Sequence, residues 1–210
     1  MKFEQQRAEQ RHSRILDAAL KIFSRKGYHD SSVDEIADAS DTSKGGVYFH
    51  FPGKQAIFLA LMDRAARRLL DRVEEAITRE SEPVAKAEAG LHVVLRTFGG
   101  HRALARLFLI EAYGGGREFH ARLMEIHELF IGVLKLHLDD AVLSGAIAPV
   151  DTELAGRVWF GAINEIITHW LLTDHPKPLE ESYSLLRPLI FRSVGAELPA
   201  ERGDALKEIR

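Results

Sequence analysis

The chain has 210 residues, of which 46% are hydrophobic and 28% charged, and its formal net charge is −3 at pH 7. It is long enough to bury a sizeable core in one or two domains, and this composition is ordinary for a globular protein. The absence of cysteine excludes disulfides, thiolate metal sites and cysteine nucleophiles, and it suits a reducing cytoplasm. The charged N-terminus has no signal-peptide pattern and no stretch of 18 apolar residues occurs, so we expect no membrane contact.

The first predicted helix covers residues 11–25, after about ten polar residues that we expect to be frayed. Its apolar residues share one face, as in an amphipathic helix: Ile15, Ala18, Ala19, Ile22 and Phe23. Gly27 follows the last basic residues and is the predicted C-cap.

Two short helices follow, joined by a polar turn. Residues 33–39 carry apolar side chains at i, i+3 and i+4, and the spacing from Ser32 to Glu35 fits a capping box. Residues 40–42 favour a turn, and a further helix starts near Ser43 and ends before Pro52. Two short helices joined by a three-residue turn make a helix-turn-helix.

The second helix of this pair has an unusual composition. Gly45 and Gly46 together cost about 2 kcal/mol relative to alanine, which indicates that the backbone must come close to another molecule. Side chains that bind phosphate and base edges surround them: Lys44, Tyr48, His50 and Lys54. The alternative interpretation is a small surface helix with incidental charges.

The sequence IADASDTSKGGVYFHFPGKQAIF resembles the DNA-binding motif of the TetR family of transcriptional regulators. The family pattern is matched at Lys44, Gly45, Tyr48, His50, Phe51 and Lys54. Asp41 replaces the usual turn glycine, although aspartate tolerates a left-handed backbone, and Phe49 replaces a common tyrosine or histidine. The resemblance covers roughly residues 10–60. It implies double-stranded operator DNA as a partner and these contact residues: Ser32, Ser43, Lys44, Gly45, Gly46, Tyr48, Phe49, His50 and Lys54.

The charge balance of this part is only slightly basic. Residues 1–54 hold nine lysines or arginines and eight acidic residues, a charge of +1, and the rest of the chain carries −4. We therefore expect few phosphate contacts and a modest dependence of DNA affinity on salt. A basic N-terminal arm adds Lys2, Arg7, Arg11 and Arg14.

The remaining chain is predicted to be helical throughout, without a strand pattern. Helices are expected at residues 54–79, 84–98, 102–113, 118–143, 152–172 and 179–194, with breaks at Gly99-Gly100 and at the glycine run 114–116. The helix 54–79 would link the two parts of the molecule mechanically. The predicted fold is all-α, with a DNA-binding domain at residues 1–53 and an effector-binding and dimerisation domain at residues 54–210.

The resemblance implies that the C-terminal domain binds a small-molecule effector and forms a homodimer through its last two helices. The predicted effector pocket contains Leu95, Phe98, Leu107, Phe108, Glu111, Phe130 and Trp159. The predicted dimer interface contains Trp170, Leu186 and Ile190. Asn164 and Glu165 stand among apolar residues, and they either face solvent or form a polar part of the pocket or interface.

Catalytic motifs are absent from the sequence. His127-Glu128 begins a possible zinc motif, but position 131 is isoleucine rather than the second histidine ligand. No nucleophile elbow, Walker A or dinucleotide fingerprint occurs, so we expect no enzyme activity, metal or cofactor. The predicted function is a cytoplasmic, nucleoid-associated repressor released from DNA by an apolar or amphipathic effector such as an acyl-CoA. The alternative is an architectural DNA-binding dimer without an effector.

Overall fold

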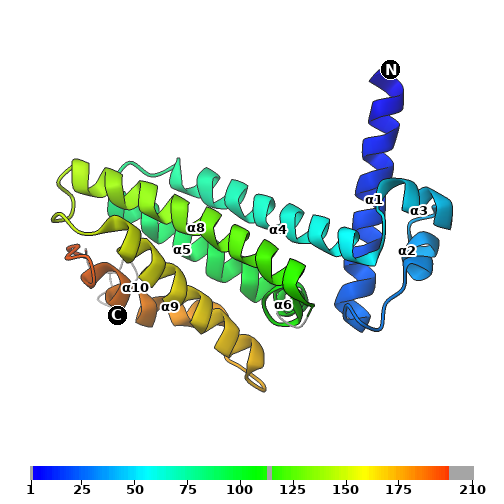
Figure 1. The fold of residues 1–210 in the computed structure, drawn as a ribbon. Helices are drawn as coiled ribbons and strands as arrows, with labels where there is room; N and C mark the ends of the chain where they lie inside the picture. Colours follow the sequence, from blue (N-terminus) through cyan, green and yellow to red (C-terminus); the bar gives the residue numbers. More distant parts are fainter. Residues whose placement is uncertain (1, 113–114, 199–210) are drawn as a thin grey trace, which may run out of the picture.

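The computed structural model describes residues 2–112 and 115–198, and within these residues the chain forms helices and no strand, as predicted. Figure 1 shows them in order: α1 (Lys2–Lys26), α2 (Val33–Ala39), α3 (Lys44–His50), α4 (Lys54–Ile77), α5 (Pro83–Gly100), α6 (Arg102–Arg106), the π-helix η1 (Leu107–Glu111), α8 (Arg117–Leu143), α9 (Thr152–Leu172), the 3₁₀-helix η2 (Leu179–Ser182) and α10 (Tyr183–Arg192).

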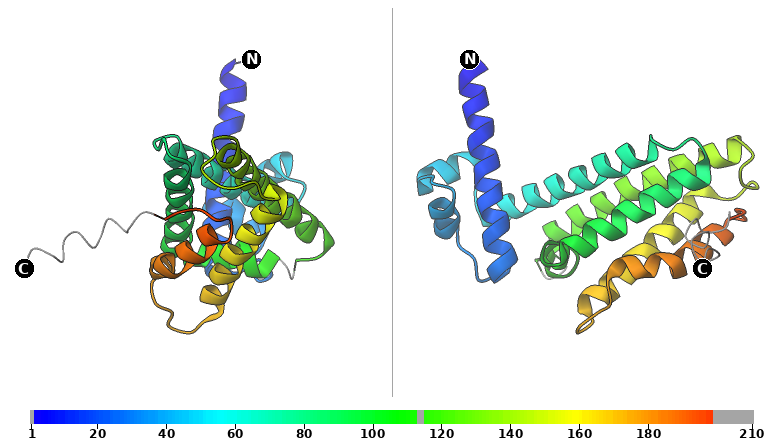
Figure 2. Two further views of the ribbon diagram at one scale, coloured as in Figure 1. Left: turned by 90° about the vertical axis from the view of Figure 1, so that its left-hand side faces the viewer. Right: turned by 180° about the vertical axis from the view of Figure 1, so that it is seen from behind.

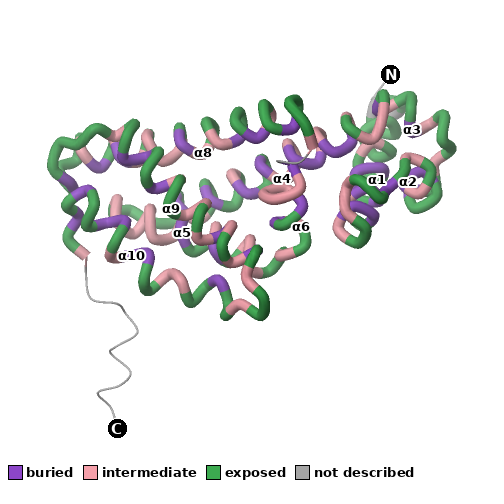
Figure 3. The backbone as a smooth tube through the Cα atoms, turned by 60° about the horizontal axis from the view of Figure 1, so that its bottom comes forward, coloured by how far each residue is buried: buried purple, intermediate pink, exposed green. Residues whose placement is uncertain are grey.

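The helices form two parts joined by α4. Helices α1, α2 and α3 form a small unit at one end, and α4 starts within it and extends along the larger helical bundle (Figures 1 and 2). In the bundle α4 packs along α5 and α8 along α9, while α10 packs against α5. The buried residues lie on the inward faces of these helices (Figure 3). Helix α4 is therefore the covalent and mechanical link that the sequence predicts.

The predicted capping residues fix the helix-turn-helix. Ser32 Oγ accepts the N–H of Glu35 at 3.2 Å and the Glu35 carboxylate accepts the N–H of Ser32 at 3.0 Å, which confirms the capping box. Ser43 caps α3 by accepting the N–H of Gly46 at 3.1 Å. Asp41 has φ 49°, so aspartate occupies the left-handed conformation of the turn.

Several predicted boundaries are wrong. Helix α1 starts at Lys2 rather than near residue 11, because the first ten residues are mostly strong helix formers without glycine or proline. Helix α5 continues through Gly99 and Gly100, and His101 is its C-cap. The predicted helix at 102–113 is split into α6 and η1, and the last helix begins as the 3₁₀-helix η2.

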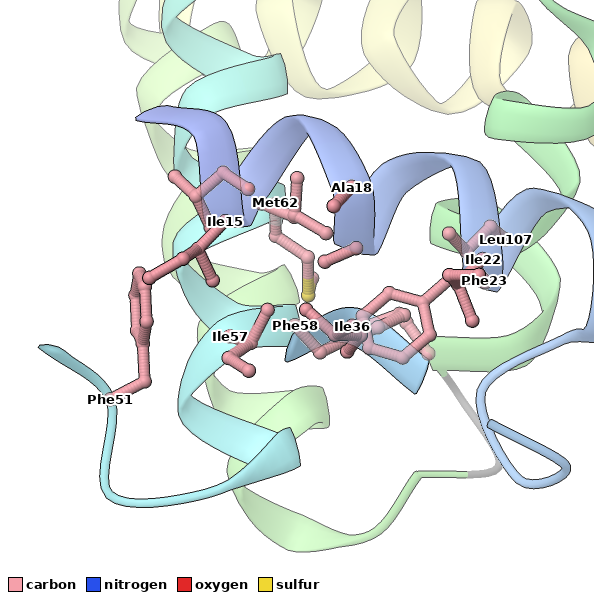
Figure 4. Packing of buried hydrophobic residues seen from close by; sticks show 14 of the residues in the cluster. Ile15, Ala18, Ile22, Phe23, Ile36, Phe51, Ile57, Phe58, Met62 and Leu107 are labelled. Atoms are coloured by element: carbon pink, nitrogen blue, oxygen red, sulfur yellow. The ribbon is translucent and has the colours of Figure 1, made fainter. Parts of the chain in front are cut away.

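The core of the DNA-binding end is continuous with the bundle. One buried cluster contains Ile15, Ile36 and Val47, and also Leu107 of η1 and residues of α8. Figure 4 shows α1 and α4 contributing side chains to this cluster. The predicted domain boundary at residue 53 coincides with the start of α4, but the hydrophobic core crosses it. Tyr48 of α3 lies outside this core, since its side chain is exposed.

Phe58 occupies the centre of this shared core. Its ring stacks on Phe119 of α8 at 4.7 Å and lies edge-on to Tyr28 at 5.0 Å, to Phe23 of α1 at 5.6 Å and to Phe108 of η1 at 5.8 Å. One side chain of α4 thus contacts the DNA-binding end and the bundle at the same time.

We expect Phe58→Ala to lower the free energy of unfolding by about 3–5 kcal/mol, because it removes a buried aromatic side chain and leaves a cavity. Phe49→Ala is the matched control: Phe49 is 83% exposed, so the same substitution should change stability by less than about 0.5 kcal/mol. Urea denaturation followed by circular dichroism measures both. Equal stability losses for the two variants would contradict the central role of Phe58.

Candidate DNA interface and ligand cavity

Helix α3 presents one face outward and buries the other. Val47 is fully buried, while Lys44, Gly45, Tyr48 and Phe49 are exposed on the outer face. A Cβ at Gly45 would meet no atom within 4 Å, so this glycine leaves the outer surface open to a close approach. The outer face therefore combines an accessible backbone with a cation, a phenol and an exposed aromatic ring.

Gly46 has a different role from its neighbour. A Cβ at this position would lie 2.8 Å from Thr42 Cγ2 and 3.2 Å from Ser43 Oγ. Glycine is therefore required by the internal packing of the turn, and the sequence interpretation that both glycines serve a partner is supported by geometry only for Gly45.

The two predicted phosphate-binding lysines differ in their surroundings. Lys44 Nζ forms an exposed ion pair with Asp34 at 2.8 Å, and such a surface pair exchanges easily for another anion. Lys54 Nζ instead donates to the main-chain carbonyls of Tyr28, His29 and Ser31 at 2.7, 3.0 and 2.8 Å. Because an ammonium group has three N–H donors, Lys54 is fully used inside the protein, and its predicted contact with phosphate is not supported.

His50 ends α3 beside His12 of α1. Their ring centroids lie 6.2 Å apart, and the His12 ring also lies 4.7 Å from the ring of Phe51. Burial, aided by the positive potential of His50 and Arg64, lowers the pKa of His12, so His12 is neutral at pH 7. The end of α3 therefore packs on α1 through contacts between aromatic rings.

A cavity of about 440 Å³ lies inside the bundle, within the size range of ligand pockets. Helices α4, α5, α8 and α9 contribute most of its wall, and Leu20 of α1 and Phe108 of η1, which also pack against the core of the DNA-binding end, line it too. Its lining is almost entirely apolar, as expected for a site that takes a hydrophobic ligand.

Four of the predicted pocket residues line this cavity: Phe98, Phe108, Phe130 and Trp159. Leu95, Leu107 and Glu111 do not line it. Leu95 and Leu107 are each 1% exposed within the packed core. The Glu111 carboxylate points toward α1 and accepts the N–H of Tyr28 at 2.9 Å.

The polar lining residues are few, and the sequence analysis singled out only one of them as a possible pocket residue. Asn164 lines the cavity, whereas its neighbour Glu165 is exposed. Asn164 is therefore a polar part of the cavity wall, and Glu165 faces solvent. His127 and His137 also line it, and burial lowers the pKa of both, so they are neutral at pH 7.

The other polar lining residues are Thr97, His101 and three arginines of α4: Arg64, Arg68 and Arg72. The spacing of these arginines, four residues apart along one helix, was the available sequence signal for this row, which was not predicted.

Two of the three predicted dimer-interface residues are buried within the monomer. Leu186 and Ile190 are 6% and 5% exposed inside the monomer. Trp170 is half-buried, and its Nε1–H donates to the carbonyl of Lys177 at 2.8 Å. The apolar side chains that remain exposed on the last two long helices are Leu154, Val158, Leu172, Leu185 and Leu189.

Within the described residues, no group of three or more histidine and carboxylate side chains could hold a metal ion. None of the helices in the same ranges is both long and apolar enough to cross a membrane.

Comparison with known proteins gives the family. The profile described as "Bacterial regulatory proteins, tetR family" matches residues 15–61, and the profile "YsiA-like protein, C-terminal region" matches residues 62–191. The fatty acid metabolism regulator protein of Bacillus subtilis (strain 168) is 27% identical over 165 residues, which cover 78% of this chain and 85% of that protein.

Solved structures agree with these sequence matches. The crystal structure of the Bacillus subtilis transcriptional regulator FadR in complex with stearoyl-CoA aligns with a TM-score of 0.78 and 25% identity, covering 89% of this chain and 99% of that one. The TetR family regulator PfmR from Thermus thermophilus aligns with a TM-score of 0.66 and 27% identity over 85% of this chain and 97% of that one. The chain therefore belongs to the TetR family, and it is a ligand-responsive transcriptional repressor that binds DNA.

Proposed function

We propose that this protein holds operator DNA as a homodimer and that a long-chain acyl-CoA entering the cavity releases it. The observation that carries the proposal is the position of the cavity. Leu20 of α1, Met62 of α4 and Phe108 of η1 line it, so its wall includes side chains that pack on the DNA-binding helices. A ligand there acts on the elements that set the position of α3. Operator binding would place the protein on the nucleoid in the cytoplasm.

An acyl-CoA fits the chemistry of the cavity lining. The apolar interior suits an acyl chain, and the arginines at positions 64, 68 and 72 of α4 suit an anionic head group. The structural relative from Bacillus subtilis was solved with stearoyl-CoA. An architectural protein without an effector needs only a solid core, so the cavity argues against that alternative.

The outer face of α3 is the proposed DNA contact surface. The contacts we retain from the sequence are Ser32, Ser43, Lys44, Gly45, Tyr48, Phe49 and His50. The Ser32 and Ser43 side chains already cap α2 and α3, so their contribution includes holding the two helix N-termini in shape. Lys44 supplies the one lysine charge on α3 itself.

We expect Lys44→Gln to reduce the slope of log affinity against log salt concentration by about one unit, because one phosphate contact is lost. Fluorescence anisotropy with an operator selected from random duplexes measures this slope. Lys177→Gln is the control, since Lys177 is exposed in the segment after α9, away from α3. A wild-type slope for Lys44→Gln would remove Lys44 from the interface.

Lys54→Met should behave differently. It breaks three hydrogen bonds to main-chain carbonyls, and hydrogen bonds to charged groups contribute about 1.5–3 kcal/mol each to stability. The melting temperature should therefore fall, while the salt slope of the folded variant stays at the wild-type value. A reduced slope with an unchanged melting temperature would restore Lys54 as a phosphate contact.

The effector test compares acyl chain lengths. Stearoyl-CoA should weaken operator binding about 5- to 150-fold, the usual range of allosteric coupling, while acetyl-CoA and free CoA should not. Val94→Trp narrows the cavity and should abolish the response, whereas Val150→Trp, at an exposed position, should keep it. Release by acetyl-CoA, or an unaltered response in Val94→Trp, would show that the acyl chain does not act through this cavity.

A dimer face is available on α9 and α10. Leu185 and Leu189 are 73% and 72% exposed and lie one turn apart, and Leu154 and Val158 form a similar pair on α9. Exposed apolar rows of this kind mark contact surfaces. A twofold contact through them brings two copies of α3 into one molecule, as a palindromic operator requires.

We expect Leu185→Asp/Leu189→Asp to give a folded monomer with weak operator binding, because two half-sites about 34 Å apart, or a multiple of it, must be held together. Leu143→Asp is the matched control, since Leu143 is 84% exposed at the end of α8. Analytical ultracentrifugation at micromolar concentration distinguishes the outcomes. A dimeric double variant would place the interface elsewhere.

A further inference from the structure

The arginines of α4 form a row where the cavity meets solvent. Arg64, Arg68 and Arg72 recur every four residues, so they share one face, and the row extends about 12 Å along the helix. All three line the cavity, but Arg68 and Arg72 are also exposed, which places them at its edge. Among the described ion pairs, none involves Arg68 or Arg72.

Arg64 is the least exposed member of the row, and the Nη1 and Nη2 groups of its guanidinium have no aligned hydrogen-bond partner among the described residues. Its side chain is 15% exposed, and Nη1 lies 2.8 Å from Asp17 Oδ1. That contact is not aligned as a hydrogen bond, and buried Nη2 has no hydrogen-bond partner within the described residues. Burial lowers the pKa of Arg64, but arginine remains protonated, so a cation with unused donors faces the cavity.

A buried cation with unused donors is unfavourable, and an anion placed beside it supplies what is missing. Asp17, the other member of the ion pair, loses little stabilisation when Arg64 binds another anion. The Asp17 carboxylate is 56% exposed, so water can solvate it once Arg64 leaves. Asp17 belongs to α1, whereas Arg64 belongs to α4.

We propose that Arg64, Arg68 and Arg72 bind the phosphate or carboxylate head group of the cavity ligand, and that this anion takes Arg64 away from Asp17 and loosens α1 from α4. The inference deepens the proposed function, because it assumes a ligand in the cavity, but it does not require the ligand to be a CoA ester. His127 and His137 are neutral and most other lining residues are apolar, so the arginine row receives the charge and the apolar lining receives the tail.

Because the anion competes with Asp17 for Arg64, the ligand has different affinities for two states of the protein. It binds more strongly when Arg64 is free than when Arg64 is paired with Asp17, and only such a difference can shift the protein between two states. If operator DNA favours the paired state, DNA must weaken anion binding by the same factor by which the anion weakens DNA binding.

The first experiment uses simple amphiphiles that share one tail. Isothermal titration calorimetry on the full-length protein, below the micelle concentration, compares dodecyl phosphate with dodecanol. Wild-type protein should prefer dodecyl phosphate about ten-fold or more, the usual contribution of charge-assisted hydrogen bonds. Arg64→Gln should abolish this preference and leave dodecanol affinity within about two-fold. Dodecanoate, run in parallel, distinguishes a carboxylate head from a phosphate.

Two further variants keep the test independent of the folding of Arg64→Gln. Arg68→Gln changes an exposed side chain and should reduce the preference for dodecyl phosphate. Arg67→Gln, one residue away but outside the cavity lining, should retain it. Equal preference in Arg68→Gln and Arg67→Gln would overturn the arginine row as an anion site.

Asp17→Asn tests the exchange itself. Removing the competing carboxylate should tighten dodecyl phosphate binding about two- to five-fold, the usual contribution of an exposed ion pair, and should shrink the effect of the ligand on operator affinity. An unchanged or weaker affinity for dodecyl phosphate would overturn the exchange.

The outcomes separate this inference from the proposed effector. If stearoyl-CoA releases the operator equally well from wild type and Arg64→Gln, the anion site is wrong and the effector stands. If stearoyl-CoA does nothing but dodecyl phosphate is preferred through Arg64, the effector is wrong and the site stands. Failure of every amphiphile to bind wild type would overturn both.

Discussion

The aromatic contacts of Phe58 are the constraint on which the rest of the molecule depends. Helices α2 and α3 have seven residues each, too few to bury a core, so Ile36 and Val47 are fully buried only because α1 and α4 cover them. Phe58 joins this small core to η1 and α8. Close-packed interiors do not deform continuously, so α4 cannot shift inside the bundle without repacking the face that supports α3. The ligand cavity and the DNA surface therefore share one structural element rather than two independent domains.

Polar contacts hold the loop between α1 and α2 from two directions. Lys54 of α4 donates to three of its carbonyls and lies 4.5 Å from the centre of the Tyr28 ring, while Glu111 of η1 accepts the N–H of Tyr28. Both residues were expected to serve a ligand: Lys54 a phosphate and Glu111 an effector. Their actual partners are main-chain groups of a loop that carries few apolar side chains of its own. The main-chain N–H and C=O groups of this loop need hydrogen-bond partners. Lys54 and Glu111 provide these partners, which explains why two charged side chains have a structural role here.

The helix pattern was predictable because amphipathic periodicity follows burial directly, and the caps at Ser32 and Ser43 depend on residues close in sequence. The failures come from non-local effects. Glycines at 99 and 100 cost about 1 kcal/mol each in a helix, yet α5 continues through both, since a propensity of this size does not by itself end a helix. In α10 both Leu185/Leu189 and Leu186/Ile190 are apolar pairs at helical spacing, and periodicity cannot decide which pair faces inward. The carbonyl partners of Lys54 lie 23–26 residues away in sequence, so no motif indicates them.

The π-helix η1 connects the cavity to the same loop by a second route. Within five residues it buries Leu107 in the core shared with α1, places Phe108 on the cavity wall and directs Glu111 to Tyr28. A ligand that displaces Phe108 therefore displaces the residue that holds the loop after α1. The Arg64–Asp17 ion pair reaches α1 itself, from α4. Both routes end on α1 and its following loop, and neither contacts α3. Since α2 and α3 pack on α1 and α4, the proposed ligand would act on α3 by changing how α1 packs on the bundle.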